Sequence, residues 1–170
     1  MKENVFNNLW RVYRKANANL MVTVTGNSMF PVICDGDMVN IMPSELYSVG
    51  DIVVYKNKTI IIHRIVEAHS NSNGTRFYFS KGDNNLTRDP PLIERCILGK
   101  VTKVFREDKT LEINNGIFQR ALTNLSILKD SRKKQYIWVR IIEWCQKIVT
   151  YFCWLNAKAN RKSLKREDKN

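Results

Sequence analysis

The part of this sequence that most constrains its fold is a short turn between two strand-like runs. The turn, Gly26-Asn27-Ser28-Met29-Phe30-Pro31, follows residues 20–25 and precedes residues 38–41. A glycine ahead of Ser28 allows the backbone a tight path, and Pro31 fixes the exit of the turn. The turn therefore presents a small hydroxyl side chain at a rigid position. That position suits a nucleophile, although serine is also common in ordinary turns.

Residues 20–116 have the pattern of a mainly β, antiparallel protein. Short runs of β-forming residues alternate with turn signals such as Asn73-Gly74. Residues 60–66 form the strongest predicted strand, and residues 76–80 are its expected hairpin partner. Helices do not alternate with these strands, which argues against a doubly wound α/β fold.

Further boxes follow the Ser28 turn in a fixed order, at residues 35–37, 49–55, 63–66, 80–85 and 99–101. In this order and spacing, residues 20–105 resemble the catalytic core of type I signal peptidases. The His-Arg-Ile-Val and Lys-Gly-Asp-Asn-Asn boxes resemble the branch found in the endoplasmic reticulum, archaea and some spore-forming bacteria. The resemblance implies the mainly β signal peptidase/LexA-like fold and a serine endopeptidase.

The predicted catalytic residues follow from what a serine nucleophile needs. The Ser28 hydroxyl reacts only when a base takes its proton, and His63 is the candidate base. His63 shares a strand face with apolar residues, so without the other boxes it would also suit a core histidine. Two carboxylates six residues apart, Asp83 and Asp89, could orient His63. We expect Asp89 to orient it and Asp83 to hold the loop, with the reverse assignment left open.

Three departures from the resembled pattern affect this prediction. Many bacterial signal peptidases have a hydroxyl two residues before the nucleophile, where this chain has Gly26. The backbone N–H of Ser28 is therefore the first predicted oxyanion donor, and Asn27 or a second backbone amide is the alternative for the second. Bacterial housekeeping enzymes and LexA-like proteins use a lysine base, but the matching strand position here is His63, and Lys56 and Lys58 lie in the preceding turn. The third departure is that no spanning helix precedes the Ser28 box.

The sequence predicts four regions: a short amphipathic helix over residues 1–19, a peptidase core over 20–116, a helical appendage over 117–156 and a basic tail over 157–170. The net charge is +12. Residues 129–170 carry twelve basic and four acidic residues, a net +8. Such a region suits an anionic membrane surface or nucleic acid, and a solvated tail is the alternative.

The segment 136–156 is mostly apolar. Apart from Gln146, its polar residues form a narrow stripe, Arg140, Glu143, Lys147 and Thr150. Charges at the centre of a spanning helix cost about 2.5–3.5 kcal/mol each, more than the apolar residues return. We therefore expect this helix to lie in the membrane interface, with docking on its own domain or on a second subunit as the alternative. No signal peptide is visible, so the expected location is cytoplasmic or peripheral on the membrane.

The resemblance implies a substrate as well as a reaction. The partner would be a precursor protein or peptide bound as an extended strand beside Ser28 and cut at small residues to remove a signal or leader segment. No cofactor is expected, and the four cysteines and two histidines do not form a zinc motif.

Two rival functions stay open. A LexA-like self-cleaving regulator would need a helix-turn-helix, for which the residues before position 20 are too few. The second rival is a membrane or nucleic-acid binding module that keeps only the fold. Such a module would not need Ser28, His63 and both aspartates, and the presence of all four argues against it. We therefore expect no nucleic-acid partner.

Overall fold

The computed structural model describes residues 12–13, 16, 18–114, 116–129 and 136–167. Most of the helix predicted over residues 1–19 lies outside the described residues, but Val12, Tyr13 and Ala16 are helical. The Tyr13 hydroxyl donates a hydrogen bond of 2.6 Å to the Ile41 carbonyl, and this bond ties the segment to the sheet.

The described residues contain one eight-stranded antiparallel sheet, in the order β1-β2-β7-β3-β4-β5-β6, with β8 paired to β7. The elements are β1 (Leu20–Thr23), β2 (Met38–Met42), β3 (Ile52–Lys56), β4 (Ile60–Ser70), β5 (Arg76–Lys81), β6 (Leu92–Ile93), η1 (Glu94–Cys96), β7 (Ile97–Arg106), β8 (Lys109–Glu112), α2 (Ile117–Lys129) and α3 (Tyr136–Glu167). The predicted mainly β fold with a C-terminal helical part is confirmed. β4, which contains residues 60–66, pairs with β5 as expected, but the register runs from Arg64 opposite Lys81 to Ser70 opposite Arg76, and residues 60–64 pair with β3.

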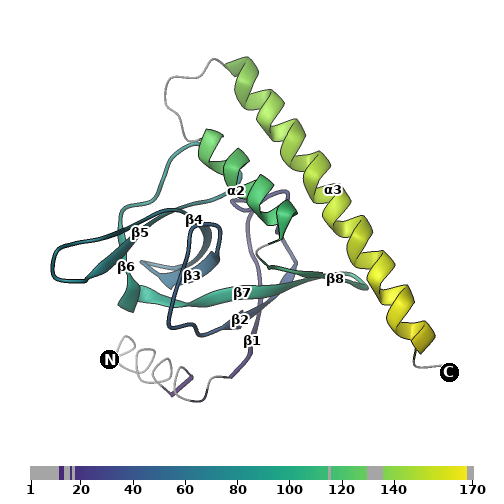
Figure 1. The fold of residues 1–170 in the computed structure, drawn as a ribbon, viewed down its shortest axis with the longest axis horizontal. Helices are drawn as coiled ribbons and strands as arrows, with labels where there is room; N and C mark the ends of the chain where they lie inside the picture. Colours follow the sequence, from purple (N-terminus) through teal and green to yellow (C-terminus); the bar gives the residue numbers. More distant parts are fainter. Residues whose placement is uncertain (1–11, 14–15, 17, 115, 130–135, 168–170) are drawn as a thin grey trace.

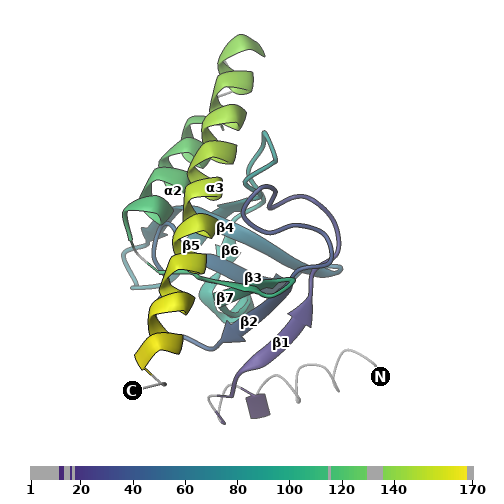
Figure 2. The ribbon, with the colours of Figure 1, turned by 90° about the vertical axis from the view of Figure 1, so that its right-hand side faces the viewer.

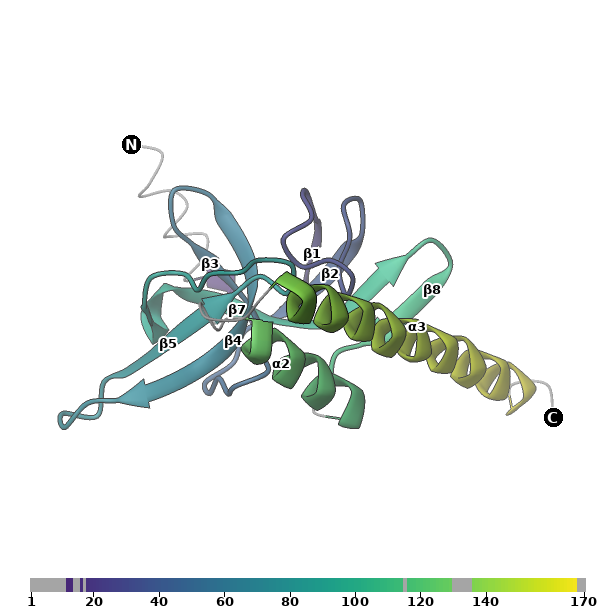
Figure 3. The same cartoon turned by 90° about the horizontal axis from the view of Figure 1, so that it is seen from above.

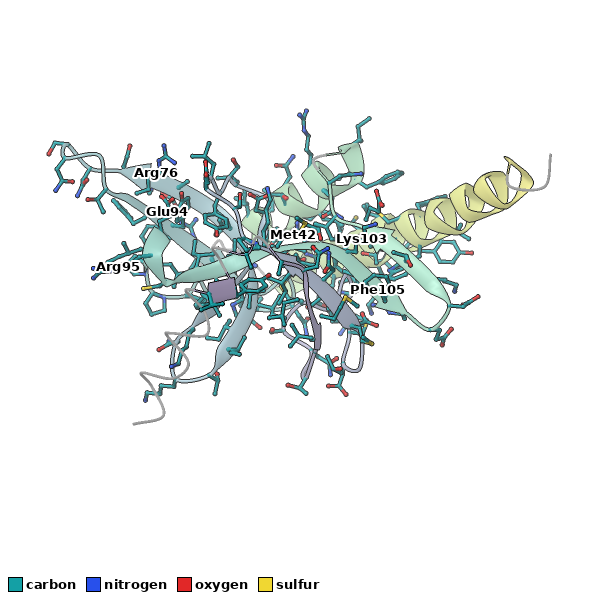
Figure 4. The ribbon with its side chains drawn as sticks, turned by 90° about the horizontal axis from the view of Figure 1, so that it is seen from below. Met42, Arg76, Glu94, Arg95, Lys103 and Phe105 are labelled. Carbon is teal, nitrogen blue, oxygen red and sulfur yellow. The ribbon has the colours of Figure 1, made fainter. Side chains whose placement is uncertain are left out.

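The two helices α2 and α3 lie side by side and cover one face of the sheet (Figure 1; Figure 3). The main core lies beneath them and includes Val54, Leu98 and Val104 from the strands, Leu122 from α2 and Trp154 from α3. Seen from the side, α3 runs along the whole molecule (Figure 2). Met42, Lys103 and Phe105 lie on the opposite face of the sheet (Figure 4).

A second, smaller core lies where β3, β4 and β5 meet. It is built around Tyr55, Ile65 and Tyr78. Because neighbouring residues of a strand point to opposite faces, β4 sends alternate side chains into the two cores. His63 lies beside the small core, and Arg64 points toward the helices.

The helix α3 differs from the prediction in two respects. It continues past Asn156 to Glu167, because residues 157–167 contain good helix formers and no proline or glycine. One of its faces is docked on the β-domain and α2, with Ile142, Gln146 and Thr150 buried, so the predicted polar stripe does not face water along its whole length. Within the described residues, no helix is long and apolar enough to cross a membrane.

Candidate active site

Ser28 lies in the loop that joins β1 to β2, here called the serine loop (residues 24–37). Gly26 has a positive φ of 92°, which a glycine adopts without strain. Its N–H donates a 2.7 Å hydrogen bond to Asp35 Oδ1 across the loop. The base of the loop is closed by backbone bonds between Val24 and residues 36 and 37. The predicted turn is therefore the tip of a larger, tied loop.

The serine loop is also anchored from below. Met29, Val32 and Ile33 are buried in the main core. Asp37 accepts two hydrogen bonds from the Arg106 guanidinium, of 2.9 and 2.7 Å. The buried side chains and the ion pair together restrain the backbone on both sides of Ser28, which is itself half-buried.

A second loop, here called the aspartate loop (residues 82–89), follows β5 and holds the backbone of Ser28. The Asn84 N–H donates to the Ser28 carbonyl oxygen at 2.8 Å. The Asn84 side-chain amide donates to the Asn27 carbonyl at 3.1 Å. These bonds restrain the peptide groups on both sides of the Ser28 Cα, and the group between Asn27 and Ser28 carries the Ser28 N–H, the predicted oxyanion donor. The donor roles of Ser28 and Asn27 themselves stay predictions.

His63 contacts Asp89 at the other end of the aspartate loop. His63 Nδ1 lies 2.7 Å from Asp89 Oδ2, and the histidine is only 6% exposed. The same carboxylate oxygen accepts a 2.7 Å hydrogen bond from Ser80 Oγ, and Ser80 Oγ lies 3.2 Å from the Tyr55 hydroxyl. Burial alone would raise the pKa of Asp89. Its pKa is nevertheless below the ordinary value, because the hydrogen bond and charge of His63 and hydrogen bonds from Ser80 and Tyr55 lower it. The carboxylate thus stays ionised beside the imidazole.

Asp83 has a different partner. Its two carboxylate oxygens accept hydrogen bonds from Arg64 Nε and Nη2 at 2.9 and 2.8 Å. Both side chains are almost completely buried. Of the two candidate aspartates, Asp89 therefore contacts His63, and Asp83 is held in an ion pair with the next residue of β4.

The sheet brings the serine loop and His63 to the same end of the β4–β5 pair. Arg64, which follows His63, is the cross-strand partner of Lys81. The residue after Lys81 is Gly82, which lies directly against the Ser28 carbonyl. The register of one strand pair thus determines where the Ser28 backbone lies relative to His63.

The lysine residues do not all lie where the sequence predicted. Lys56 is the last residue of β3 rather than part of the turn, whereas Lys58 is exposed in the turn. Lys81 is fully buried and donates to the Asn85 carbonyl at 3.0 Å. It therefore stabilises the aspartate loop from within.

Sequence reasoning gave no role to Ser80, Tyr55, Arg64 or Lys81. All four lie in the boxes that carry the resemblance, so their positions in those boxes were the available signal. Their partners could not be read from the sequence, because the contacts join residues up to 26 positions apart through the sheet register. Cross-strand partners are adjacent in space but are not marked by any local pattern.

Comparison with known proteins also finds relatives among peptidases and signal peptidase subunits. A Peptidase S24-like family model matches residues 3–85, just under half of the chain. The signal peptidase complex catalytic subunit SEC11 of Eremothecium gossypii is 35% identical over 95 residues, which cover 54% of this chain and 54% of that protein. The SEC11 subunit of Lachancea thermotolerans is 40% identical over 77 residues, 42% of this chain and 46% of that protein.

A sec11 subunit from Dictyostelium discoideum is 38% identical over 73 residues, 41% of each chain. The predicted resemblance to signal peptidases of the endoplasmic-reticulum type is confirmed by these matches. The chain spans about half the length of the curated relatives that it matches.

Proposed function

We propose that this protein is a serine endopeptidase that removes a signal or leader segment from a precursor, with Ser28 as nucleophile, His63 as general base and Asp89 as the carboxylate that orients His63. The observation that carries the proposal is the 2.7 Å contact between His63 Nδ1 and Asp89, next to the strand pair that positions the Ser28 loop. The similarity to signal peptidase catalytic subunits supports the reaction class.

The contact with Asp89 decides which ring nitrogen is free. A neutral imidazole that donates Nδ1–H to the carboxylate leaves Nε2 as the acceptor. His63 Nε2 takes the proton of Ser28 Oγ as the oxygen attacks the scissile carbonyl carbon. The same nitrogen then gives that proton to the departing amine, and water later releases the acyl group from Ser28. Asp89 stabilises the imidazolium that exists between these steps.

The negative charge that develops on the substrate oxygen needs fixed donors. The backbone N–H of Ser28 and the side chain of Asn27 are the proposed pair. Hydrogen bonds from Asn84 to the carbonyls of Ser28 and Asn27 support this role, because they restrain the backbone around Ser28, including the peptide group that carries its N–H.

The proposed substrate is an extended precursor segment with small residues around the cut. β1 is at the end of the strand order and, among the described residues, pairs only with β2. Its second edge can therefore accept an added strand, as in other cases of peptide recognition by strand addition. The chain then continues directly from β1 into the serine loop, which would bring a bound segment toward Ser28.

The test is cleavage of a library of precursor peptides, read by mass spectrometry, with labelling of Ser28 by a fluorophosphonate reagent as an independent readout. We expect cuts after small residues and labelling that disappears in Ser28→Ala. Cleavage by Ser28→Ala at the wild-type rate would overturn the mechanism. Cleavage of the protein's own chain alone would instead support the self-cleaving alternative.

We further propose that the outer face of α3 lies on an anionic membrane surface. Docking of α3 leaves Ile141, Trp144, Tyr151, Phe152 and Leu155 exposed along one side of the helix, and Trp144 is 64% exposed. Aromatic residues of this kind suit the headgroup region of a bilayer. The surplus of basic residues in the C-terminal part of the chain supports an anionic surface.

A further inference from the structure

Two buried glutamines, one from each C-terminal helix, contact the ion pair that holds the aspartate loop. Gln119 of α2 accepts a 3.2 Å hydrogen bond from Arg64 Nη1 through its side-chain oxygen. Gln146 of α3 donates a 3.4 Å hydrogen bond from Nε2 to the Asp83 carbonyl. Both side chains are buried, with exposed fractions of 6% and 1%.

These contacts continue without a break to the backbone of Ser28. Arg64 binds both carboxylate oxygens of Asp83, and the next residue, Asn84, donates its N–H to the Ser28 carbonyl. The path from Gln119 to Ser28 therefore runs through the Arg64–Asp83 ion pair and the Asp83–Asn84 peptide, and the path from Gln146 runs through that peptide alone. Since the Arg64 side chain is fully buried, it cannot replace a lost protein partner with bulk water.

A second contact joins α3 to the serine loop itself. The Trp154 ring packs on the Arg106 guanidinium at 4.6 Å, and Arg106 binds Asp37 and the Val32 carbonyl of that loop. A cavity of about 200 Å³ lies between α3 and the two loops. It is lined by Phe30 and Pro31 of the serine loop, by Asn84 of the aspartate loop and by Glu143, Gln146 and Lys147 of α3. The helix thus lies beside both loops that meet at Ser28.

We infer that Gln119 and Gln146 are positioning residues for the proposed reaction. Gln119 acts through Arg64 and Asp83, and Gln146 acts through the Asp83 carbonyl, so that docking of α2 and α3 sets the place of the Ser28 backbone and is required for an active serine. This inference rests on the proposed function. The Gln119 oxygen satisfies one of the two Nη1 hydrogens of Arg64, and the Gly50 carbonyl takes the other at 3.0 Å. When the Gln119 oxygen is removed, the guanidinium shifts toward its remaining partners and moves Asp83 with it.

The test compares four single variants in the full-length protein. Gln119→Leu and Gln146→Leu each remove one hydrogen bond, because leucine is apolar but has a side chain of similar size. The matched controls are Ser126→Ala on α2 and Thr150→Val on α3, because both hydroxyls are buried and have no hydrogen-bond partner among the described residues. Gln119→Glu keeps the oxygen that accepts from Arg64 and serves as the conservative variant.

Two readouts separate positioning from mere stabilisation. The first is the rate at which a fluorophosphonate labels Ser28, measured well below the melting temperature of every variant. The second is hydrogen–deuterium exchange at the Asn84 amide, which is bonded to the Ser28 carbonyl. We expect about tenfold slower labelling and faster exchange in the two leucine variants. The Gln119→Glu variant and both controls should keep wild-type labelling and exchange.

Wild-type labelling and unchanged Asn84 exchange in both leucine variants would overturn the inference while leaving the proposed function intact. The inference would also be overturned if the two controls slowed labelling as much as the leucine variants, because the loss would then reflect helix stability alone. Failure of the reagent to label the wild-type protein would count against the proposed function, and the exchange data alone would then decide whether the helices hold the loop.

Discussion

Gly82 lies directly against the backbone of Ser28. A Cβ atom added at Gly82 would come within 2.5 Å of the Ser28 carbonyl oxygen and 2.9 Å of the Asn85 side-chain nitrogen. The first of these atoms is main chain and cannot rotate away. The glycine in the aspartate loop is therefore required by the close approach of the serine loop, and not by an unusual φ.

Gly82→Ala should consequently inactivate the protein while leaving the sheet folded. The methyl group must push the Ser28 carbonyl away, and a displacement of about 1 Å at a reacting group can cost about 100-fold in rate. Overpacking of this kind also destabilises by about 1–3 kcal/mol. Cleavage assays and thermal unfolding measure the two effects. Gly74→Ala is the control for stability, because an added Cβ there meets nothing within 4 Å although its φ of +80° makes it strained. An active Gly82→Ala variant would show that the two loops can separate without harm.

The second prediction distinguishes a histidine base from a lysine base. His63→Ala should lower the cleavage rate by about 10²–10⁴-fold, the usual contribution of general acid–base catalysis. Lys56→Ala and Lys58→Ala should retain wild-type rates, because these side chains lie at the far end of β3 and in the turn that follows it. The comparison is of kcat on one precursor peptide. An active His63→Ala together with an inactive lysine variant would reverse the assignment.

The third prediction separates the two aspartates. Asp89→Asn should reduce turnover by roughly 10⁴-fold and should cost less stability than Asp83→Asn, since an orienting carboxylate mainly stabilises the imidazolium. Asp83→Asn should act on stability, by about 3–5 kcal/mol, because it leaves the buried Arg64 charge without its partner. Urea unfolding and turnover are measured for both. If Asp83→Asn is stable and inactive and Asp89→Asn is fully active, the two roles are exchanged.

The fourth prediction concerns acid stability. The pKa of Asp89 is lowered in the folded protein, so the folded state binds this proton less readily than the unfolded state does. The resulting stabilisation is present above the unfolded-state pKa, about 3.9 for an aspartate, and is lost as the pH falls through the lower folded-state pKa. The difference in unfolding free energy between wild type and Asp89→Asn should therefore shrink as the pH falls below about 4.

This prediction is checked by urea unfolding of both proteins between about pH 6 and pH 2, a range that brackets the aspartate transition. Ser80→Ala removes one of the hydrogen bonds that lower the folded-state pKa of Asp89, so its acid-induced loss of stability should be smaller and should be complete at a higher pH than in the wild type. A difference between wild type and Asp89→Asn that does not change across the whole range would contradict the assignment of the lowered pKa to Asp89.

Parts of this architecture could be predicted from the sequence because they depend on local patterns. The turn at Ser28 and the hairpin at Asn73-Gly74 follow from glycine and strand-forming residues. The order of the boxes was enough to select Ser28, His63 and the two aspartates as candidates. The partners of each aspartate were not predictable from periodicity, because Asp83 and Asp89 lie in one irregular loop where side-chain directions do not alternate.

The helical part was harder to predict for a different reason. Gln146 and Thr150 are polar residues, and a polar residue on an amphipathic helix is expected to face water. In the structure both are buried, because α3 docks on the β-domain with this face and Gln146 bonds to the Asp83 carbonyl. Tertiary contacts thus override the simple pattern, and the apolar side that remains includes Trp144 and Tyr151.

The last prediction is that this outer face of α3 binds anionic vesicles. Basic residues near the surface of such a bilayer contribute about 1 kcal/mol each, and the sequence predicts this role for Lys133, Lys134, Arg161 and Lys162. Lys133 and Lys134 lie outside the described residues. Because exposed charges are screened, we expect co-sedimentation with vesicles containing phosphatidylserine at low salt and less of it at high salt.

The exposed aromatic residues provide the sharper test. The triple variant Trp144→Gln, Tyr151→Gln and Phe152→Gln removes apolar surface from the outer face without touching the buried face, so the fold should persist and vesicle binding should fall. Leu46→Gln is the matched control, because Leu46 is 58% exposed in the loop between β2 and β3. If the triple variant and the wild type bind equally, the aromatic face does not contact lipid. If the wild type resists both salt and alkaline extraction, the helix inserts more deeply than an interfacial helix can.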